Sequence, residues 1–212
     1  MAQDRRNFLA LSGATAGLVL SGCSRHGTSD FEAFAHEEHK PISASSNFAE
    51  LVRAATLAPN GHNTQPWRFA ELPKGAIITP DFARRTPIVD PDDHHLFISL
   101  GCAAENFLLA ASAQGRPGAL RFDGEQGGRI EIELGSGNLG VDTLAAAIPW
   151  RQSTRSDYNG RPVATSQLKL LEEAALIEGV SLKLITDRAK LSDVLGFLSR
   201  GNDNQMEDPR FV

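Results

Sequence analysis

The stretch AATLAPNGHNTQPWRF, residues 54–69, decides the fold class predicted for this 212-residue chain. Pro59 ends an apolar helical run, because proline clashes with the preceding helical turn and donates no backbone hydrogen bond. The polar residues Asn60 to Gln65 then form a turn that offers backbone and side-chain amides. Because an amide side chain both donates and accepts, Asn63 suits the edge of a flat heterocycle. The alternative is a capped turn beside a buried tryptophan, since turns rich in Asn and Gly are common.

Residues 59–67, PNGHNTQPW, resemble the P-S-x-x-N-x-Q-P-W loop of the FMN-binding nitroreductase family, with Asn60 in place of the usual serine. In that family the Pro, Ser and Asn positions lie against the isoalloxazine ring of the flavin. The resemblance therefore implies that four residues contact the ring of FMN: Pro59, Asn60, Gly61 and Asn63. It also implies an α+β fold, with an antiparallel-rich sheet flanked by helices and a long buried central helix.

Arg151, Ser153 and Arg155 form a second pattern, R-x-S-x-R, which resembles the nitroreductase motif that holds the flavin phosphate and ribityl chain. Two guanidinium groups supply forked donors to phosphate oxygens, and a serine hydroxyl adds a third contact. Alone, this pattern is typical of a solvated loop. Its occurrence in the same chain as the Asn63 loop indicates a cofactor site. The resemblance implies transfer of hydride or electrons through FMN to a small-molecule acceptor, such as a nitroaromatic or a quinone, with no catalytic side chain.

The two motifs occur in the reverse of the order usual in nitroreductases, where R-x-S-x-R precedes the Asn loop. This order resembles the double-length subgroup of the family, in which two fused halves form an internal pseudo-dimer in place of a homodimer. We therefore expect a first half at 47–143, the start of a second half at 144–212, and one composite site between their motifs. The chain stops inside the expected second half, so we expect a truncated product or a fragment.

Residues 1–22 have the pattern of an export signal and are excluded from the fold prediction. Arg5-Arg6 resembles a twin-arginine motif, and the apolar run that follows is too short to span a bilayer. The segment LSGC resembles the lipobox of bacterial lipoproteins, which implies lipidation of Cys23. Residues 23–46 are small and polar, as expected of a tether. We therefore expect an exported protein, anchored by lipid at a periplasmic or other extracytoplasmic membrane face.

Composition and charge narrow the classes of partner. The net charge is -5, and no stretch clusters Lys and Arg, so we do not expect nucleic-acid binding. The segment 84–95 is rich in acids and histidines but has no H-x-x-x-H or C-x-x-C spacing, so we expect no metal site. With Cys23 lipidated, Cys102 stands alone in an apolar run, where we expect a small hydrophobic residue and not a nucleophile.

Periodicity predicts the remaining elements. An Asn47 cap with Glu50 three residues later predicts a helix that runs to about Ala58. The run 97–114 is apolar on nearly all sides, which predicts a buried helix ended by Gly115. The predicted strands are 68–71, 76–79, 129–134 and 180–185, and two further helices are expected after caps at Thr165 and Asp187.

The electron donor is left open, because an exported protein meets little NAD(P)H. Two alternatives to an enzyme remain, the first because of this open donor and the second because the chain stops inside the expected second half. One is a flavin-binding or flavin-sequestering lipoprotein that does not turn over, and the other is a truncated, inactive homologue.

Overall fold

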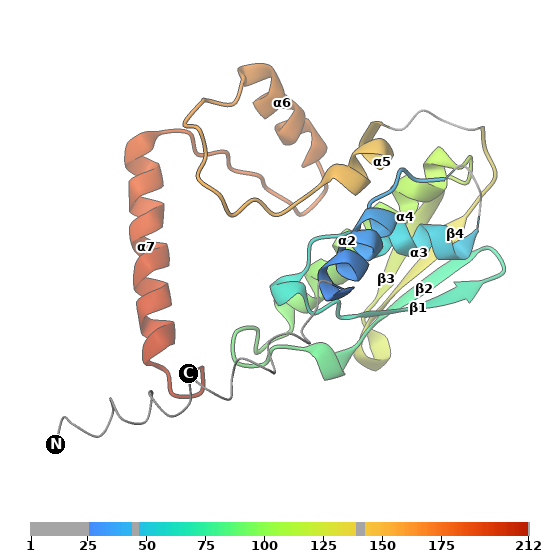
Figure 1. The fold of residues 1–212 in the computed structure, drawn as a ribbon, viewed down its shortest axis with the longest axis horizontal. Helices are drawn as coiled ribbons and strands as arrows, with labels where there is room; N and C mark the ends of the chain where they lie inside the picture. The colour runs from blue at the N-terminus through green and yellow to red at the C-terminus, as the bar shows by residue number, and fades with distance from the viewer. Residues whose placement is uncertain (1–25, 44–46, 139–142, 212) are drawn as a thin grey trace. The chain divides into compact units, whose positions relative to one another are not determined.

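The computed structural model describes residues 26–43, 47–138 and 143–211 (Figure 1). The predicted export signal and Cys23 lie outside the described residues. The chain divides into two compact units. The first comprises residues up to Arg84 together with 95–151, and the second comprises 85–94 together with the residues from Gln152 onward.

The first unit contains a helix, α3 (Phe48–Thr56), that starts where the sequence predicts. The Asn47 side chain accepts a hydrogen bond from the backbone N–H of Glu50 at 2.8 Å, which satisfies one of the donors left unpaired at a helix start. The helix ends two residues before the predicted boundary, because the residue that precedes Pro59 is disfavoured in helical conformation. The chain continues from the end of α3 into the loop that contains Asn63.

The long helix α4 (His94–Ala113) confirms the prediction of a buried central helix. Eight of its residues are buried, with Leu100 and Phe107 in the same core as α3 and the sheet. Gly115 ends the helix with a φ of 75°, and the N–H of Arg116 returns to the carbonyl of Ala111 at 2.8 Å. Within the described residues, α4 is the one helix long and apolar enough to cross a membrane, and its burial accounts for that composition.

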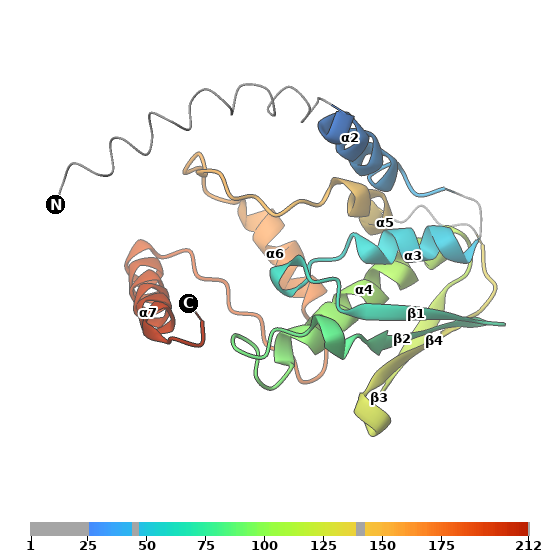
Figure 2. The same ribbon diagram turned by 60° about the horizontal axis from the view of Figure 1, so that its bottom comes forward.

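A four-stranded antiparallel sheet packs against these helices, which confirms the α+β class. Its strands are β1 (Trp67–Leu72), β2 (Gly75–Pro80), β3 (Gly118–Asp123) and β4 (Arg129–Leu134), in the order β1-β2-β4-β3. Figure 2 shows α3 and α4 on one face of the sheet. Ile78, Ile130 and Ile132 are buried on that face. Three of the strands were predicted, and β3 was not.

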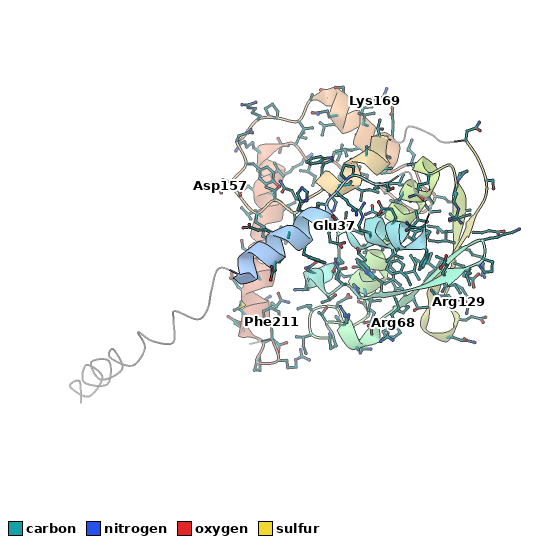
Figure 3. The ribbon with its side chains drawn as sticks, turned by 45° about the vertical axis from the view of Figure 1, so that its right-hand side comes forward. Glu37, Arg68, Arg129, Asp157, Lys169 and Phe211 are labelled. Atoms are coloured by element: carbon teal, nitrogen blue, oxygen red, sulfur yellow. The ribbon has the colours of Figure 1, made fainter. Side chains whose placement is uncertain are left out.

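The other face of the sheet carries charged side chains. Arg121 pairs with Glu131 at 2.6 Å and Arg129 pairs with Asp123 at 2.9 Å, and both pairs link β3 to β4. Arg129 is labelled in Figure 3, which also shows Arg68 of β1 on the sheet. This clean division between an apolar and a charged face is usual for an antiparallel sheet with helices on one side only.

The segment predicted as a tether contains a helix, α2 (His26–Glu38). Figure 2 shows α2 on the side of α3 that faces away from the sheet. Further along the chain, the short helix α5 (Thr143–Ala147) continues into a 3-10 turn, η5 (Ile148–Trp150). The His39 ring donates from Nδ1 to the carbonyl of Pro149 at 2.7 Å, which joins the chain after α2 to this turn.

The second unit contains α6 (Thr165–Ala174) and α7 (Arg188–Glu207). The predicted cap of α7 is confirmed, because the Asp187 side chain accepts from the N–H of Lys190 at 2.9 Å. The predicted cap of α6 is wrong by one position. Ala164 precedes the first helical residue, and the Thr165 side chain stands inside the helix.

The strand predicted at 180–185 is wrong. That segment is irregular, and no strand pairs with it among the described residues. Alternating apolar residues form a strand only where a partner completes the ladder.

Neither α6 nor α7 has a buried residue, and Lys169 and Asp157, labelled in Figure 3, point outward.

Candidate functional site

The loop that joins α3 to β1 has an unusual backbone. Three of its non-glycine residues adopt left-handed conformation: His62 with φ 51°, Asn63 with φ 56° and Gln65 with φ 53°. Such conformations are uncommon outside glycine and cost free energy unless the surroundings enforce them. They gather at ligand-binding loops, where the side chains must point in fixed directions. The composition of the loop alone did not predict this geometry.

Hydrogen bonds from two sides enforce the loop conformation. The Asn60 side chain donates to the carbonyl of Ala58 at 3.2 Å and accepts from the N–H of Gln65 at 2.9 Å. The N–H of Gly61 donates to the Ser99 hydroxyl on α4 at 3.2 Å. The Asn60 side chain and the Gly61 amide thus hold the loop itself. Their predicted contacts with a ring would have to come from the loop backbone and its surface.

Asn63 and Gln65 present their side-chain amides beside the end of α3. Gln65 donates from Nε2 to the carbonyl of Thr56 at 3.4 Å and to Oδ1 of Asn63 at 3.3 Å. The second contact orients the Asn63 amide, so that its NH₂ group is turned away from Gln65. An oriented amide of this kind can donate to a ligand and still accept from it.

A cavity of about 560 Å³ lies beside these amides, within the first unit. Asn63 and Gln65 line one part of it, and Phe31 and Phe34 of α2 line another. Arg151 contributes a guanidinium group to the same cavity. Its size is within the range of about 300 to 1,000 Å³ that is usual for small-molecule and cofactor sites.

Arg151 is held against the end of α3. Its Nε and Nη2 atoms donate to the carbonyl of Leu57 at 3.2 and 3.0 Å. The last carbonyls of a helix lack partners within the helix, so a cationic donor is favourable there. These two bonds use two of the five N–H donors of the guanidinium. The structure therefore brings Arg151 to the same cavity as Asn63, although the two motifs are far apart in the sequence.

Ser153 and Arg155 belong to the second unit, in an exposed and irregular segment. In the part of the chain that the structure describes, neither side chain makes a hydrogen bond. The first unit thus contains Arg151 together with the loop residues Pro59, Asn60 and Gly61. Ser153 and Arg155 stay predicted site residues.

Cys102 lies on α4 and is half-buried. Burial raises the pKa of its thiol, although the positive charge of Arg151 acts in the opposite direction. A protonated, half-buried thiol is a weak nucleophile. Among the described residues no cluster of three His, Cys, Asp or Glu side chains could hold a metal ion.

The sequence prediction missed the contribution of α2 to the cavity. Phe31, Phe34 and Ala35 follow the i, i+3, i+4 spacing that places three side chains on one helix face. That spacing was a usable signal. It was overlooked because the polar composition around it indicated a tether.

The fold is of the α+β class, and its cavity has a size usual for small-molecule sites. Comparison with known proteins shows distant homology to two proteins of Mycobacterium tuberculosis. These are "Putative NAD(P)H nitroreductase Rv3131" of strain H37Rv and "Putative NAD(P)H nitroreductase MT3217" of strain CDC 1551. The chain is 32% identical to each over 155 residues, which are 67% of this chain and 44% of the relative.

A third relative, "Uncharacterized protein MT1398" of strain CDC 1551, is 27% identical over 165 residues, or 76% of this chain and 23% of the relative. No family model matches the chain. The chain thus spans less than half the length of the two nitroreductase-named relatives, and its homology to them suggests an oxidoreductase.

Proposed function

We propose that this chain is the flavin-binding part of a nitroreductase-type oxidoreductase, with FMN in the cavity beside Asn63 and Arg151. One observation carries the proposal. The two motifs that resemble flavin-binding motifs contribute Asn63 and Arg151 to a single cavity of about 560 Å³. Distant homology to proteins named as NAD(P)H nitroreductases also supports the proposal.

The residues present fit a flavin. The amides of Asn63 and Gln65 can donate and accept along a ring edge such as C2=O, N3–H and C4=O. Pro59, Asn60 and Gly61 do not line the cavity, and we assign them to the loop surface next to it. Arg151 supplies a positive charge, and its forked donors match phosphate oxygens.

The proposed site is composite. Ser153 and Arg155 follow Arg151 closely in the chain, and we assign them to the phosphate and ribityl end of FMN. Two guanidinium groups would then share the charge of the phosphate, and the Ser153 hydroxyl would add a neutral hydrogen bond. The site would hold a ring at the loop and a phosphate at the segment 151–155.

When bound, FMN supplies hydride or electron transfer at its N5 atom, and the protein supplies binding, orientation and electrostatic tuning. The oriented amides fix the direction of the ring edge. Arg151 places positive charge near the site, which favours anionic forms of a ligand there. A nitroaromatic, a quinone or a similar small molecule would be the electron acceptor, and the donor is open.

The proposal extends to the remaining segments. Arg5-Arg6 and the LSGC segment support twin-arginine export and lipidation at Cys23, with the protein at an extracytoplasmic membrane face. The residues 144–212 would be the start of a second nitroreductase-like half, arranged as an internal pseudo-dimer or completed in a homodimer. Fractionation of cells that carry Cys23→Ser tests the anchor, because unchanged membrane association would contradict lipidation.

The test of the function is flavin uptake followed by reduction. The full chain, refolded with FMN and desalted, should retain a yellow flavin, and Asn63→Ala should shift its absorption. Retained FMN that NADPH bleaches without oxygen supports the oxidoreductase. Retained FMN that chemical reductants bleach but NADPH and NADH do not would favour a flavin-sequestering lipoprotein. A colourless protein would refute the proposal.

A further inference from the structure

Helix α2 turns two large aromatic side chains toward the cavity instead of toward a core. Phe31 is 68% exposed and Phe34 is 63% exposed, and both line the cavity together with Ala35. Exposed apolar residues that stand singly are ordinary, but two aromatic rings on one helix face beside a cavity form a binding surface. A ligand that covered them would remove apolar surface from water.

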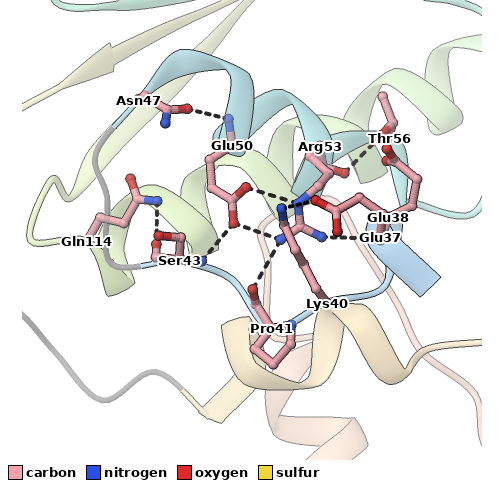
Figure 4. A network of polar contacts seen from close by, with 10 residues as sticks. All are labelled: Glu37, Glu38, Lys40, Pro41, Ser43, Asn47, Glu50, Arg53, Thr56 and Gln114. Carbon is pink, nitrogen blue, oxygen red and sulfur yellow. Dashed lines mark hydrogen bonds and ion pairs between the residues drawn. The ribbon is translucent and has the colours of Figure 1, made fainter. Parts of the chain in front are cut away.

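Buried polar contacts hold the chain that follows α2. Figure 4 shows the Arg53 guanidinium of α3 between the Glu50 carboxylate and backbone carbonyls of the segment 38–43. Arg53 donates to Glu50 at 2.7 and 3.0 Å, to the carbonyl of Pro41 at 3.4 Å and to the carbonyl of Glu38. The N–H of Ser43 donates to Glu50 at 2.7 Å.

This ion pair is a fixed structural part and not a surface contact. The side chains of Glu50 and Arg53 are each 9% exposed. Because Glu38 is the last residue of α2, its contact with Arg53 holds the end of the helix beside α3. The bond from His39 to Pro149 adds a second attachment one residue later. Hydrogen bonds, and not burial of Phe31 and Phe34, therefore fix α2 at the cavity.

The cavity consequently has two unlike walls. The α2 wall carries the rings of Phe31 and Phe34, with Glu38 at the end of the helix, whereas the opposite residues supply amides and a cation: Asn63, Gln65 and Arg151. A flat heteroaromatic ring with polar atoms along its edge matches both walls, because its face is apolar and its edge forms hydrogen bonds.

We propose that Phe31 and Phe34 are ring-contact residues that pack against the isoalloxazine ring of FMN, and that the Glu50–Arg53 pair positions them. This inference rests on the proposed function, since it names residues that bind the same ligand. It assigns the ring affinity partly to α2, which neither flavin-like motif includes.

Two readouts separate this role from a structural one. Loss of an aromatic contact should weaken FMN and riboflavin equally, by about three- to tenfold for each ring removed. Riboflavin has no phosphate, so its affinity reports the ring contacts alone. Removal of the wall should also make the fluorescence of bound riboflavin easier to quench with iodide in solution.

The experiment titrates the full chain with FMN and with riboflavin and follows flavin fluorescence. The variants are Phe31→Ala, Phe34→Ala and the double variant. Glu32→Ala is the matched control, because Glu32 is an exposed residue of the same helix that does not line the cavity. Alanine favours helix, so α2 should persist in every variant.

We expect the double variant to lose affinity for both flavins by about tenfold or more and to show increased iodide quenching, with Glu32→Ala unchanged. Two results would overturn the inference while sparing the proposed function. They are unchanged affinities in the double variant of a chain that does bind flavin, and a loss confined to FMN. Failure of the unmodified chain to bind either flavin overturns the proposed function and this inference with it.

Discussion

The loop 59–67 and the segment 151–155 both carry motifs that resemble flavin-binding motifs, but the structure holds the two in different ways. The loop is held by side-chain bonds from Asn60 and by Ser99 of α4, with three residues in left-handed conformation. In the segment only Arg151 is bonded, whereas Ser153 and Arg155 are exposed. A preorganised loop loses little conformational entropy when a ligand binds, whereas an exposed segment loses more because the ligand must order it. The loop is therefore preorganised, and the segment is not.

The units that carry these motifs differ in the same way. The first unit buries a continuous apolar core between α3, α4 and the sheet. In the second unit α6 and α7 have no buried residue, and apolar side chains such as Leu195 and Phe197 are exposed. Substitutions should therefore affect stability strongly in the first unit and weakly in the second.

The largest effect should come from a charge placed in that core. Ala104 of α4 is fully buried, so Ala104→Asp should lower the free energy of unfolding by about 4 kcal/mol or more. Leu195→Asp on α7 is the matched variant, and its effect should be within about 0.5 kcal/mol because Leu195 is exposed. Denaturant unfolding followed by circular dichroism measures both. Equal losses in the two variants would contradict the difference between the units.

The next effect concerns the ion pair that holds α2. Glu50→Gln leaves the Arg53 charge buried without its partner and should cost about 3 kcal/mol at pH 7. The hydrogen bond from Arg53 lowers the pKa of Glu50 below its ordinary value. This contribution to stability is therefore complete above the unfolded pKa of about 4.3 and is lost as the pH falls through the folded pKa.

Thermal unfolding between about pH 7 and pH 3 checks this dependence, since that range includes the unfolded pKa. The difference in melting temperature between the unmodified chain and Glu50→Gln should shrink as the solution becomes more acidic. A difference that stays constant or grows would show that the Glu50 charge does not contribute in the folded protein.

A smaller effect should follow from the loop itself. Asn60→Ala removes two hydrogen bonds and leaves the Gln65 N–H without its acceptor, at a cost of about 2 to 3 kcal/mol. Ser153→Ala, on the exposed segment, should leave stability within about 0.5 kcal/mol. Equilibrium unfolding without flavin makes the comparison, because both residues are then judged as structural groups only. Similar values for the two would mean that the loop is no more organised than the segment.

Local patterns were sufficient to predict much of the first unit. Three of its features depend on residues close in the sequence: the Asn47 cap, the strand at 129–134 and the end of α4 at Gly115. By contrast, β3 was missed because its side chains are mostly exposed, so that its pairing with β4 defines it and not its own alternation. The segment 180–185 shows the converse, since alternation without a partner strand gave no strand.

The site was predictable only in part, for a related reason. The polar loop after Pro59 was visible in the sequence, but one of the bonds that hold it comes from Ser99 of another helix, which accepts from the N–H of Gly61. The aromatic wall depends on Arg53, which reaches the backbone at the end of α2. Contacts between residues so distant in the chain leave no local pattern, although the helical spacing of Phe31 and Phe34 was itself visible in the sequence.

The composite site is the central claim, and Arg155→Ala tests it most directly. Arg151 also caps α3, so its loss would disturb the cavity, whereas Arg155 is exposed and has no such contact. Arg161→Ala, in the same exposed segment, is the matched control. Fluorescence titration should show FMN binding weakened by about tenfold or more in Arg155→Ala, because a charge-assisted phosphate contact is lost, with riboflavin binding unchanged. Equal FMN affinity in Arg155→Ala, Arg161→Ala and the unmodified chain would contradict the claim that residues 151–155 bind the phosphate.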